Sequence, residues 1–323
     1  MTAPPSFPPP RTGDGTVTGG RGPAEVVAGP ASSPLGASVR IRHGHWAPAL
    51  AVALVAAVAV WLTWRLFVVS PTGRLVDEAA FKGASYGRNR LWQVAEPVLS
   101  LISVPFIAGV LLAAILLAVL RGRVLLAVQV AVLMGGANLT TQLLKTFVFD
   151  RPAVGVTDHL ANSLPSGHTT AAASVACALV LVVPRRVRPT AAVLGALYTA
   201  ATGVSTLVGR WHRPSDAVAG VLVVLVWAGL ASALGTRGGV VRPRELRRST
   251  SVVTAFLLLA GAFAGGLAAV ALQRTLARVG VSLDHVRALV TAYAGGALGV
   301  VAVTCATFAV LLLLRRWTEP RLV

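Results

Sequence analysis

Residues 98–144 read VLSLISVPFIAGVLLAAILLAVL, RGR and VLLAVQVAVLMGGANLTTQLL, which are two apolar blocks divided by a short basic turn. A helix needs about 20 apolar residues to cross a hydrocarbon core of about 30 Å, and each block is long enough. The hydrocarbon core holds no water to satisfy backbone polar groups, so such a block crosses as an α-helix. The stretch therefore predicts two membrane-spanning helices joined by a tight turn.

The rest of the chain repeats this pattern. Apolar types make up 55% of the 323 residues and charged types 12%, which is roughly half the charged share of an ordinary soluble domain. Blocks of helical length predict eight spans, at 47–69, 98–120, 124–144, 168–183, 190–209, 215–235, 252–273 and 291–314. The sequence thus predicts an all-α polytopic membrane protein.

Composition divides the chain into four regions. Residues 1–45 are rich in Pro, Gly, Ser and Thr and lack apolar periodicity, which predicts a disordered basic tail. Residues 46–235 hold six predicted spans, the basic loop 236–251 follows, and residues 252–323 hold two additional spans with a short tail. Two roles for the additional spans stay open: a lipid access path, or a contact between copies in a homo-oligomer.

The basic residues indicate how the chain crosses the membrane. The net charge is +18, and such a balance is typical of proteins that bind nucleic acid or an anionic membrane surface. Most Lys and Arg lie in short loops beside the apolar blocks, as in 184–189 and 242–248, which argues against nucleic acid. Because cytoplasmic loops are enriched in Lys and Arg, we expect a multi-pass inner-membrane protein with both termini in the cytoplasm.

The sequence predicts neither a cofactor nor a metal site. Cys177 and Cys305 each lie inside an apolar block, where a cysteine behaves as a small apolar residue. No cluster has the ligand spacing of a zinc site. Membrane lipids are the partners that this composition favours.

Three polar patterns fall in segments that this topology places on the outer side. They read KTFVFDRP (145–152), PSGH (165–168) and HRPSD (212–216). Phosphoryl transfer needs cations around a spread negative charge, together with a nucleophile and an acid. Lys145 and Arg151 would supply cations, and a helix start at Gly167 would offer free N–H groups to an anion.

His212 and Asp216 have the spacing of a nucleophile and its orienting carboxylate. Pro214 suits the first position of a helix, so Asp216 falls in the first turn, near His212. A carboxylate that accepts the ring N–H fixes the tautomer of a histidine and raises its nucleophilicity. This pair therefore predicts a nucleophilic histidine.

Each pattern also has an ordinary structural explanation. Lys145 lies at the end of a span and can snorkel to the interface. Ser166 and Gly167 can form a capped turn, and Asp216 can offset the helix dipole. Three such patterns on one side of the membrane favour a shared phosphate site over three separate explanations.

Together the patterns resemble the signature of the type 2 phosphatidic acid phosphatase family, in the acid phosphatase/vanadium haloperoxidase superfamily. That signature runs Lys-x6-Arg-Pro, Pro-Ser-Gly-His and Ser-Arg-x5-His-x3-Asp. The order of the patterns and their places on the spans match over about residues 75–235. The many spans make the chain most similar to the bacterial membrane-bound branch.

The resemblance implies a role for each matching residue. His212 would attack phosphorus, Asp216 would orient it, and His168 would protonate the leaving lipid alkoxide. The phosphate oxygens would be held by a set of cations and donors, namely Lys145, Arg151, Ser166 and the Gly167 N–H. No metal is implied.

The sequence departs from the family signature at two places. Only five residues separate Lys145 from Arg151, and Thr206 occupies the position of the arginine in the third pattern. A phosphate-binding charge is therefore either missing or supplied by Arg210 or Arg213. We favour Arg210, because it precedes the histidine on the same approach as the family arginine.

The resemblance implies a membrane phosphatase that hydrolyses a lipid phosphate or pyrophosphate through a phosphohistidine at the outer membrane face. The absence of the family arginine leaves an alternative, a catalytically weak or inactive relative that binds or moves lipid phosphates. A vanadate-dependent haloperoxidase is a further alternative, disfavoured by the many spans.

Overall fold

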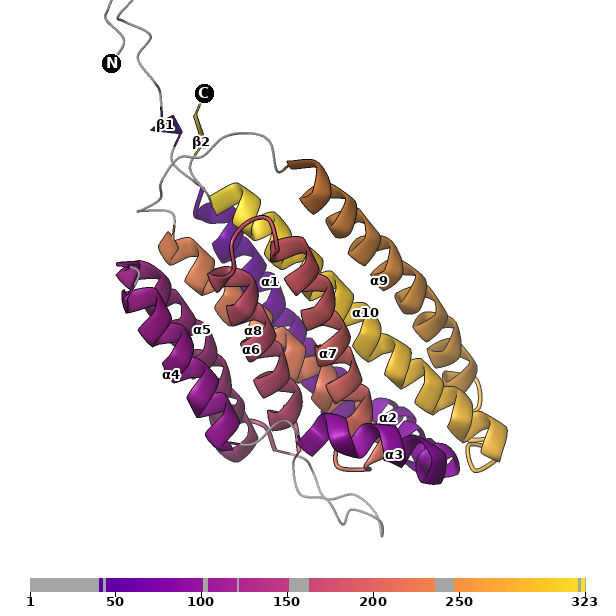
Figure 1. Ribbon diagram of the computed structural model, residues 1–323. Coiled ribbons are helices and arrows are strands. Elements are labelled where there is room, and N and C mark those ends of the chain that lie inside the picture. The colour runs from indigo at the N-terminus through magenta and orange to yellow at the C-terminus, as the bar shows by residue number, and fades with distance from the viewer. Residues whose placement is uncertain are drawn as a thin grey trace, which may run out of the picture. The chain divides into compact units, whose positions relative to one another are not determined.

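The computed structural model describes residues 41–42, 45–100, 104–120, 122–150, 163–235, 247–318 and 321–322. Most of the predicted tail 1–45, most of the loop 236–251 and Arg151 lie outside these residues. The described chain from residue 40 onward forms one compact unit. It is a bundle of helices that run side by side (Figure 1).

Apolar helices occupy all the positions of the predicted spans. They are α1 (Ala47–Trp64), α4 (Val104–Leu120), α5 (Val124–Leu143), α6 (Gly167–Val182), α7 (Arg188–Val208), α8 (Pro214–Leu234), α9 (Arg247–Leu276) and α10 (Val286–Thr318). One turn of π-helix extends α1 over Arg65–Val69, and another extends α5 over Leu144–Val148.

Within the described ranges, six of these helices are long and apolar enough to cross a membrane, and α4 and α6 are shorter apolar helices. The prediction of an all-α polytopic membrane protein is confirmed. The only strands of the described chain are β1 (Ile41–Arg42) and β2 (Arg321–Leu322), which pair antiparallel. This pairing joins segments near the two ends of the chain at one end of the bundle (Figure 1).

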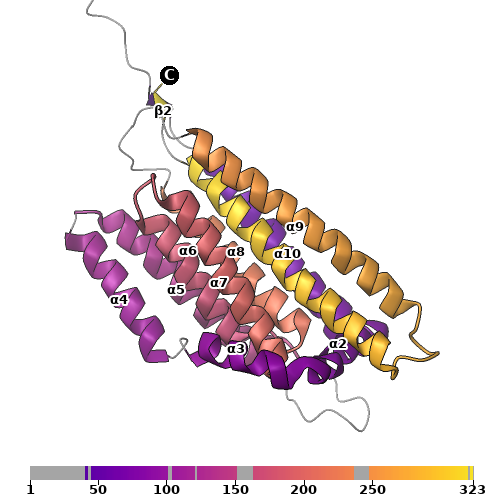
Figure 2. The same cartoon turned by 45° about the vertical axis from the view of Figure 1, so that its right-hand side comes forward.

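Two further helices, α2 (Pro71–Gly83) and α3 (Arg88–Ser100), were not predicted. A short 3₁₀ turn at Ala84–Gly87 joins them, and both lie across the end of the bundle opposite β1 and β2 (Figure 2). Ser70 caps α2 by accepting a hydrogen bond from the Gly73 N–H, and Pro71 suits its first position. The helix observed for the predicted span 98–120 starts later than predicted, because residues 98–100 belong to α3.

The last helix belongs to the interior of the bundle. Phe308 of α10 is fully buried, and its ring fills the space beside Gly195 of α7, where an added Cβ would lie 2.8 Å from the ring. By contrast, α9 packs mainly on α10 and exposes large apolar side chains such as Phe256, Leu259 and Phe263. The two additional spans thus differ, since α10 runs through the core and α9 lies at its edge, where it contributes Leu257.

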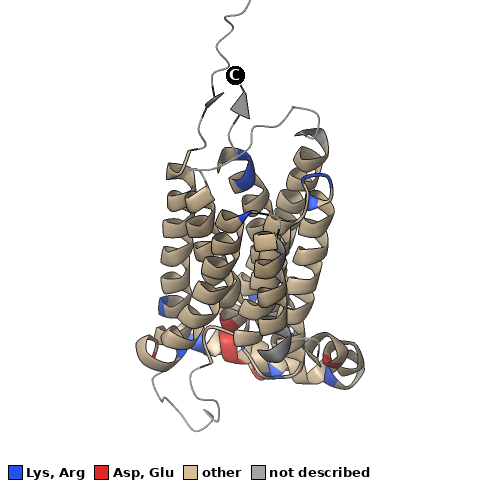
Figure 3. Cartoon of the chain, turned by 60° about the vertical axis from the view of Figure 1, so that its left-hand side comes forward, with Lys and Arg blue, Asp and Glu red and all other residues tan. Residues whose placement is uncertain are grey.

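Charges divide unequally between the two ends of the bundle. The acidic residues of the described chain lie at the end that α2 and α3 cross (Figure 3). Among the described residues, the opposite end carries arginines and no acids, at Arg123, at 185–188 and at 315–316. The predicted site residues belong to the end that carries the acids.

Candidate active site

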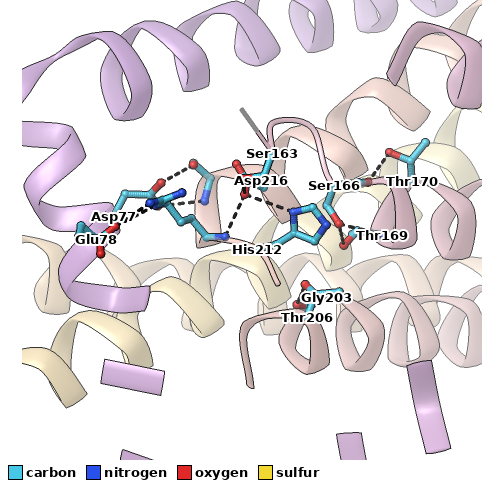
Figure 4. A network of polar contacts seen from close by, with 12 residues as sticks. Asp77, Glu78, Ser163, Ser166, Thr169, Thr170, Gly203, Thr206, His212 and Asp216 are labelled. Atoms are coloured by element: carbon cyan, nitrogen blue, oxygen red, sulfur yellow. Dashed lines mark hydrogen bonds and ion pairs between the residues drawn. The ribbon is translucent and has the colours of Figure 1, made fainter. Parts of the chain in front are cut away.

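His212 and Asp216 meet at the beginning of α8. The imidazole Nδ1 lies 3.3 Å from the Asp216 Oδ2, and both side chains are buried, at 7% and 0% exposure. A carboxylate only accepts hydrogen bonds, so this contact favours the neutral tautomer that carries its proton on Nδ1 and has a lone pair on Nε2. The predicted contact between these two side chains is therefore present, and the role of His212 as a nucleophile stays a prediction (Figure 4).

The helix start positions this carboxylate. Pro214 occupies the first turn of α8, and the Asp216 Oδ2 accepts the Arg213 backbone N–H at 3.0 Å. The same oxygen accepts a hydrogen bond from the Ser163 hydroxyl. Asp216 therefore caps the helix and also contacts the His212 ring. Its role in orienting a nucleophile stays a prediction. Ser163 precedes the second pattern and was not predicted.

Ser166 joins the second pattern to the third. Its backbone N–H donates to the Asp216 carbonyl at 2.8 Å. Its hydroxyl oxygen caps α6, accepting from the Thr169 N–H at 3.3 Å and from the Thr169 hydroxyl at 3.0 Å. The side chain is fully buried. Ser166 thus fixes the start of α6 against the start of α8, and its predicted contact with phosphate stays a prediction.

One cavity brings residues of all three patterns together. It has a volume of about 650 Å³, and its wall includes Lys145, Gly167, His168 and His212. The remainder of the wall comes from α4, α5 and α6, namely Ala108, Leu111, Met134, Gly135, Asn138, Leu139, Thr141, Gln142 and Ala171. The cavity therefore has a polar, basic end and a longer, mostly apolar side.

The two histidines line this cavity together. Their ring centroids lie 6.5 Å apart, so a group bound in the cavity can reach both. His168 also packs against Trp211 at 5.3 Å, and Trp211 meets Trp92 of α3 edge to face at 5.9 Å. These aromatic contacts hold the His168 ring in place and cover it from the side of α3.

The two candidate replacement arginines both contact α2. Arg213 is 2% exposed and donates to Glu78 through Nε at 3.1 Å and through Nη2 at 2.8 Å. The Arg210 guanidinium lies 4.6 Å from the ring centre of Phe81, and its φ of 57° is uncommon for a residue other than glycine. Arg213 thus forms an ion pair with Glu78. Phosphate binding by Arg210 stays a prediction.

Thr206 lies in the last turn of α7, where other residues enclose its side chain. It is fully buried, and its hydroxyl donates to the Gly203 carbonyl at 2.6 Å. Arg151, the other predicted cation of the first pattern, lies outside the described residues. Among the described residues, Lys145 is the cation that lines the cavity.

An acidic pair on α2 was missed by the sequence analysis. Asp77 accepts from both the backbone N–H and the hydroxyl of Ser215, with Oδ1 3.2 Å from the Ser215 nitrogen. Glu78 holds Arg213, as described above. The signal in the sequence was two adjacent acids in a short segment between spans, but their partners lie far away along the chain. Within the part of the chain that the structure describes, no three His, Cys, Asp or Glu side chains group as metal ligands would.

A comparison with known families matches part of this region. The family model described as the PAP2 superfamily matches residues 126–238, which include all three polar patterns and the helices α5 to α8. No curated protein and no solved structure matches the chain.

Proposed function

We propose that this chain, which carries a PAP2-superfamily region at residues 126–238, is a membrane phosphatase that acts on a lipid phosphate or pyrophosphate. The observation that carries the proposal is the buried His212–Asp216 pair, which opens into a cavity shared with His168 and Lys145. A protein that merely bound phosphate would need cations but no oriented nucleophile.

The reaction would proceed through a phosphohistidine. His212 Nε2 attacks phosphorus, the bond from phosphorus to the lipid oxygen breaks, and His168 donates a proton to the leaving oxygen. Water then attacks the phosphohistidine while His168 takes a proton from it, and inorganic phosphate leaves with His212 restored. Lys145 and the Gly167 N–H stabilise the charge on the transferring group, with Arg151 and Arg210 as further candidates.

The shape of the cavity supports a lipid substrate. Its basic end lies at His212 and Lys145, and Leu111, Met134 and Leu139 line the side that extends between α4 and α5. A phosphate at the basic end would leave an attached hydrocarbon chain against these apolar side chains. Phosphatidate, phosphatidylglycerol phosphate and polyprenyl (di)phosphates all have this chemistry.

The distribution of charge supports an orientation in the inner membrane. The end with Arg123 and with arginines at 185–188 and 315–316 would face the cytoplasm, as the enrichment of cytoplasmic loops in basic residues requires. Both termini would then be cytoplasmic, and the active site would lie at the outer face. Its substrate would be drawn from the outer leaflet.

Phosphate release and phosphoenzyme trapping test the proposal together. Purified protein is given a panel of lipid phosphates carrying labelled phosphorus, and acid-labile label on the protein is counted after a rapid quench. We expect the wild type to release phosphate and to trap label. His212→Ala should do neither, and His285→Ala, at an exposed histidine, should behave like the wild type. Equal labelling of His212→Ala and wild type would overturn the role of His212.

The same assay decides the second candidate function. Thr206 in place of the family arginine favours a relative that binds or moves lipid phosphates without hydrolysing them. Such a protein would retain a labelled lipid phosphate in a His212-independent way and would release no phosphate from any member of the panel.

A further inference from the structure

A second cavity lies between α8 and the hairpin of α9 and α10. Its volume is about 350 Å³. Helices α1 and α2 close it at one end, through side chains such as Phe67 and Val76. Its wall differs from that of the cavity at His212, and the catalytic proposal assigns it no role.

Small side chains leave this space open. The facing surfaces of α9 and α10 contribute Gly265, Ala268, Ala269, Gly295, Gly296 and Gly299. The cavity persists because residues of this size cannot fill the gap between three helices, and the rest of the wall is mainly apolar. Water has few partners along such a wall, since a buried water typically makes about three hydrogen bonds.

The cavity has the dimensions of one hydrocarbon chain. Along α9 its wall runs from Gly265 to Thr275, and along α10 from Ala292 to Val303, which corresponds to about 15 Å at a rise of 1.5 Å per residue. Dividing about 350 Å³ by this length gives a mean cross-section of roughly 20–25 Å². A chain whose carbons contact their neighbours at about 3.5–4.0 Å fits that width.

The polar groups of the wall gather at one end. Asp77, Ser215 and Thr275 lie where α2 crosses the bundle, and Gly299 and Val303 lie deeper. The cavity is thus polar at the level of the membrane surface and apolar along its length. A lipid with its head group outside and one chain running down between α8, α9 and α10 matches this order.

We propose that this cavity binds one hydrocarbon chain of a membrane lipid. If the cavity were empty, the side chains of its wall would lack dispersion contacts. The hydrocarbon of the membrane would surround α9 at this depth and could fill the space. The chain would touch Pro214 and Ser215, the first two residues of α8, which lie two and three positions after His212. The proposal stands without the phosphatase assignment, because it concerns binding and not turnover.

Photo-crosslinking in vesicles tests this inference. The full chain is reconstituted with a phospholipid that carries a diazirine in mid-chain, or in a parallel sample with a polyprenyl phosphate that carries one. Adducts are located by mass spectrometry. Val218 is the diagnostic position, because it lies on the central helix α8 in the cavity wall, whereas Phe263, 71% exposed on α9, reports bulk lipid.

Two substitutions fill the cavity from opposite walls. An added Cβ at Gly299 meets nothing within 4 Å, so Gly299→Leu extends into the open space, and Ala268→Leu does so from α9. Gly266→Leu is the matched control, since Gly266 also has open space but lies on the exposed side of α9. We expect wild type and Gly266→Leu to be labelled at Val218 and both filled variants to lose that label, with labelling at Phe263 unchanged.

The two probes identify the source of the chain. Labelling of Val218 by the phospholipid shows that an ordinary bilayer lipid enters, and labelling by the polyprenyl phosphate alone shows that the cavity takes the chain of a phosphorylated lipid. Absence of label at Val218 with both probes would overturn the proposal. Undiminished label at Val218 in both filled variants would do the same.

Discussion

Removal of the Glu78 carboxylate should destabilise the protein through Arg213. The arginine is 2% exposed, and its Nε and Nη2 both donate to Glu78, so Glu78→Ala leaves a buried guanidinium without this carboxylate. Breaking a fully buried pair from one side costs about 3–5 kcal/mol. Because the Glu78 side chain is 24% exposed, water can compensate in part, and we expect the lower limit, about 3 kcal/mol.

This loss is large enough to measure as a thermal shift. About 1 kcal/mol moves Tm by about 2–4 °C in domains of 150–250 residues, so a loss of about 3 kcal/mol in Glu78→Ala should lower Tm by about 6–12 °C. The unfolding is followed by tryptophan fluorescence in detergent. Glu78→Gln keeps an acceptor oxygen and should lose less. Glu96→Ala, at an exposed acid on α3, controls for the loss of a negative charge. A Tm for Glu78→Ala equal to that of Glu96→Ala would refute the reasoning.

Three further predictions concern the reaction and the topology. His168→Ala should lower kcat on a lipid phosphate by about 10²–10⁴-fold, the usual contribution of a general acid; a kcat within twofold of wild type would remove it from the mechanism. Arg210→Ala should lower kcat/KM by about 10²-fold if Arg210 binds the phosphate, with Thr206→Arg as the rescue, and near-normal kinetics would show that the enzyme works without this cation. A cysteine at Val240 should react with an impermeant maleimide only in inverted vesicles, because Cys177 and Cys305 are buried and the loop 236–251 is expected to be cytoplasmic; labelling in intact cells would reverse the topology.

The spans were predictable because a membrane imposes a length and a composition on each helix. The same criterion missed α2 and α3, which are 13 residues each and too polar to register as spans. Ser70 and Pro71 were a readable start signal for α2, but nothing local says that the helix lies across the end of the bundle. That placement depends on packing against α10, through Ala79, Ala80 and Leu289.

The contacts of the candidate site were also predictable only in part. The contact of His212 with Asp216 was predictable, because Pro214 marks the start of a helix and places Asp216 in its first turn, close to the preceding His212. The ion pair of Arg213 was not predictable from the sequence, since its partner Glu78 lies 135 positions away in the chain. Arg210 was equally hidden, because a positive φ turns its side chain toward Phe81, and sequence spacing does not encode that turn.

The acidic pair connects the additional spans to the chemistry. The backbone of α2 touches that of α10 closely, since a Cβ at Gly83 would lie 2.0 Å from the Leu289 carbonyl oxygen. From the other side of α2, Asp77 and Glu78 hold Ser215 and Arg213. These two residues lie between His212 and Asp216 in the chain.

Helix α10 therefore supports α2, and α2 supports the start of α8. The composition of the chain separates the six spans of 46–235 from the two of 252–323, but the packing runs across that division. A six-span fragment would keep the three polar patterns and lose the helix against which α2 rests. The matched region, residues 126–238, holds the proposed reacting groups, whereas the helices α2 and α10 that support the start of α8 come from the two sides of it.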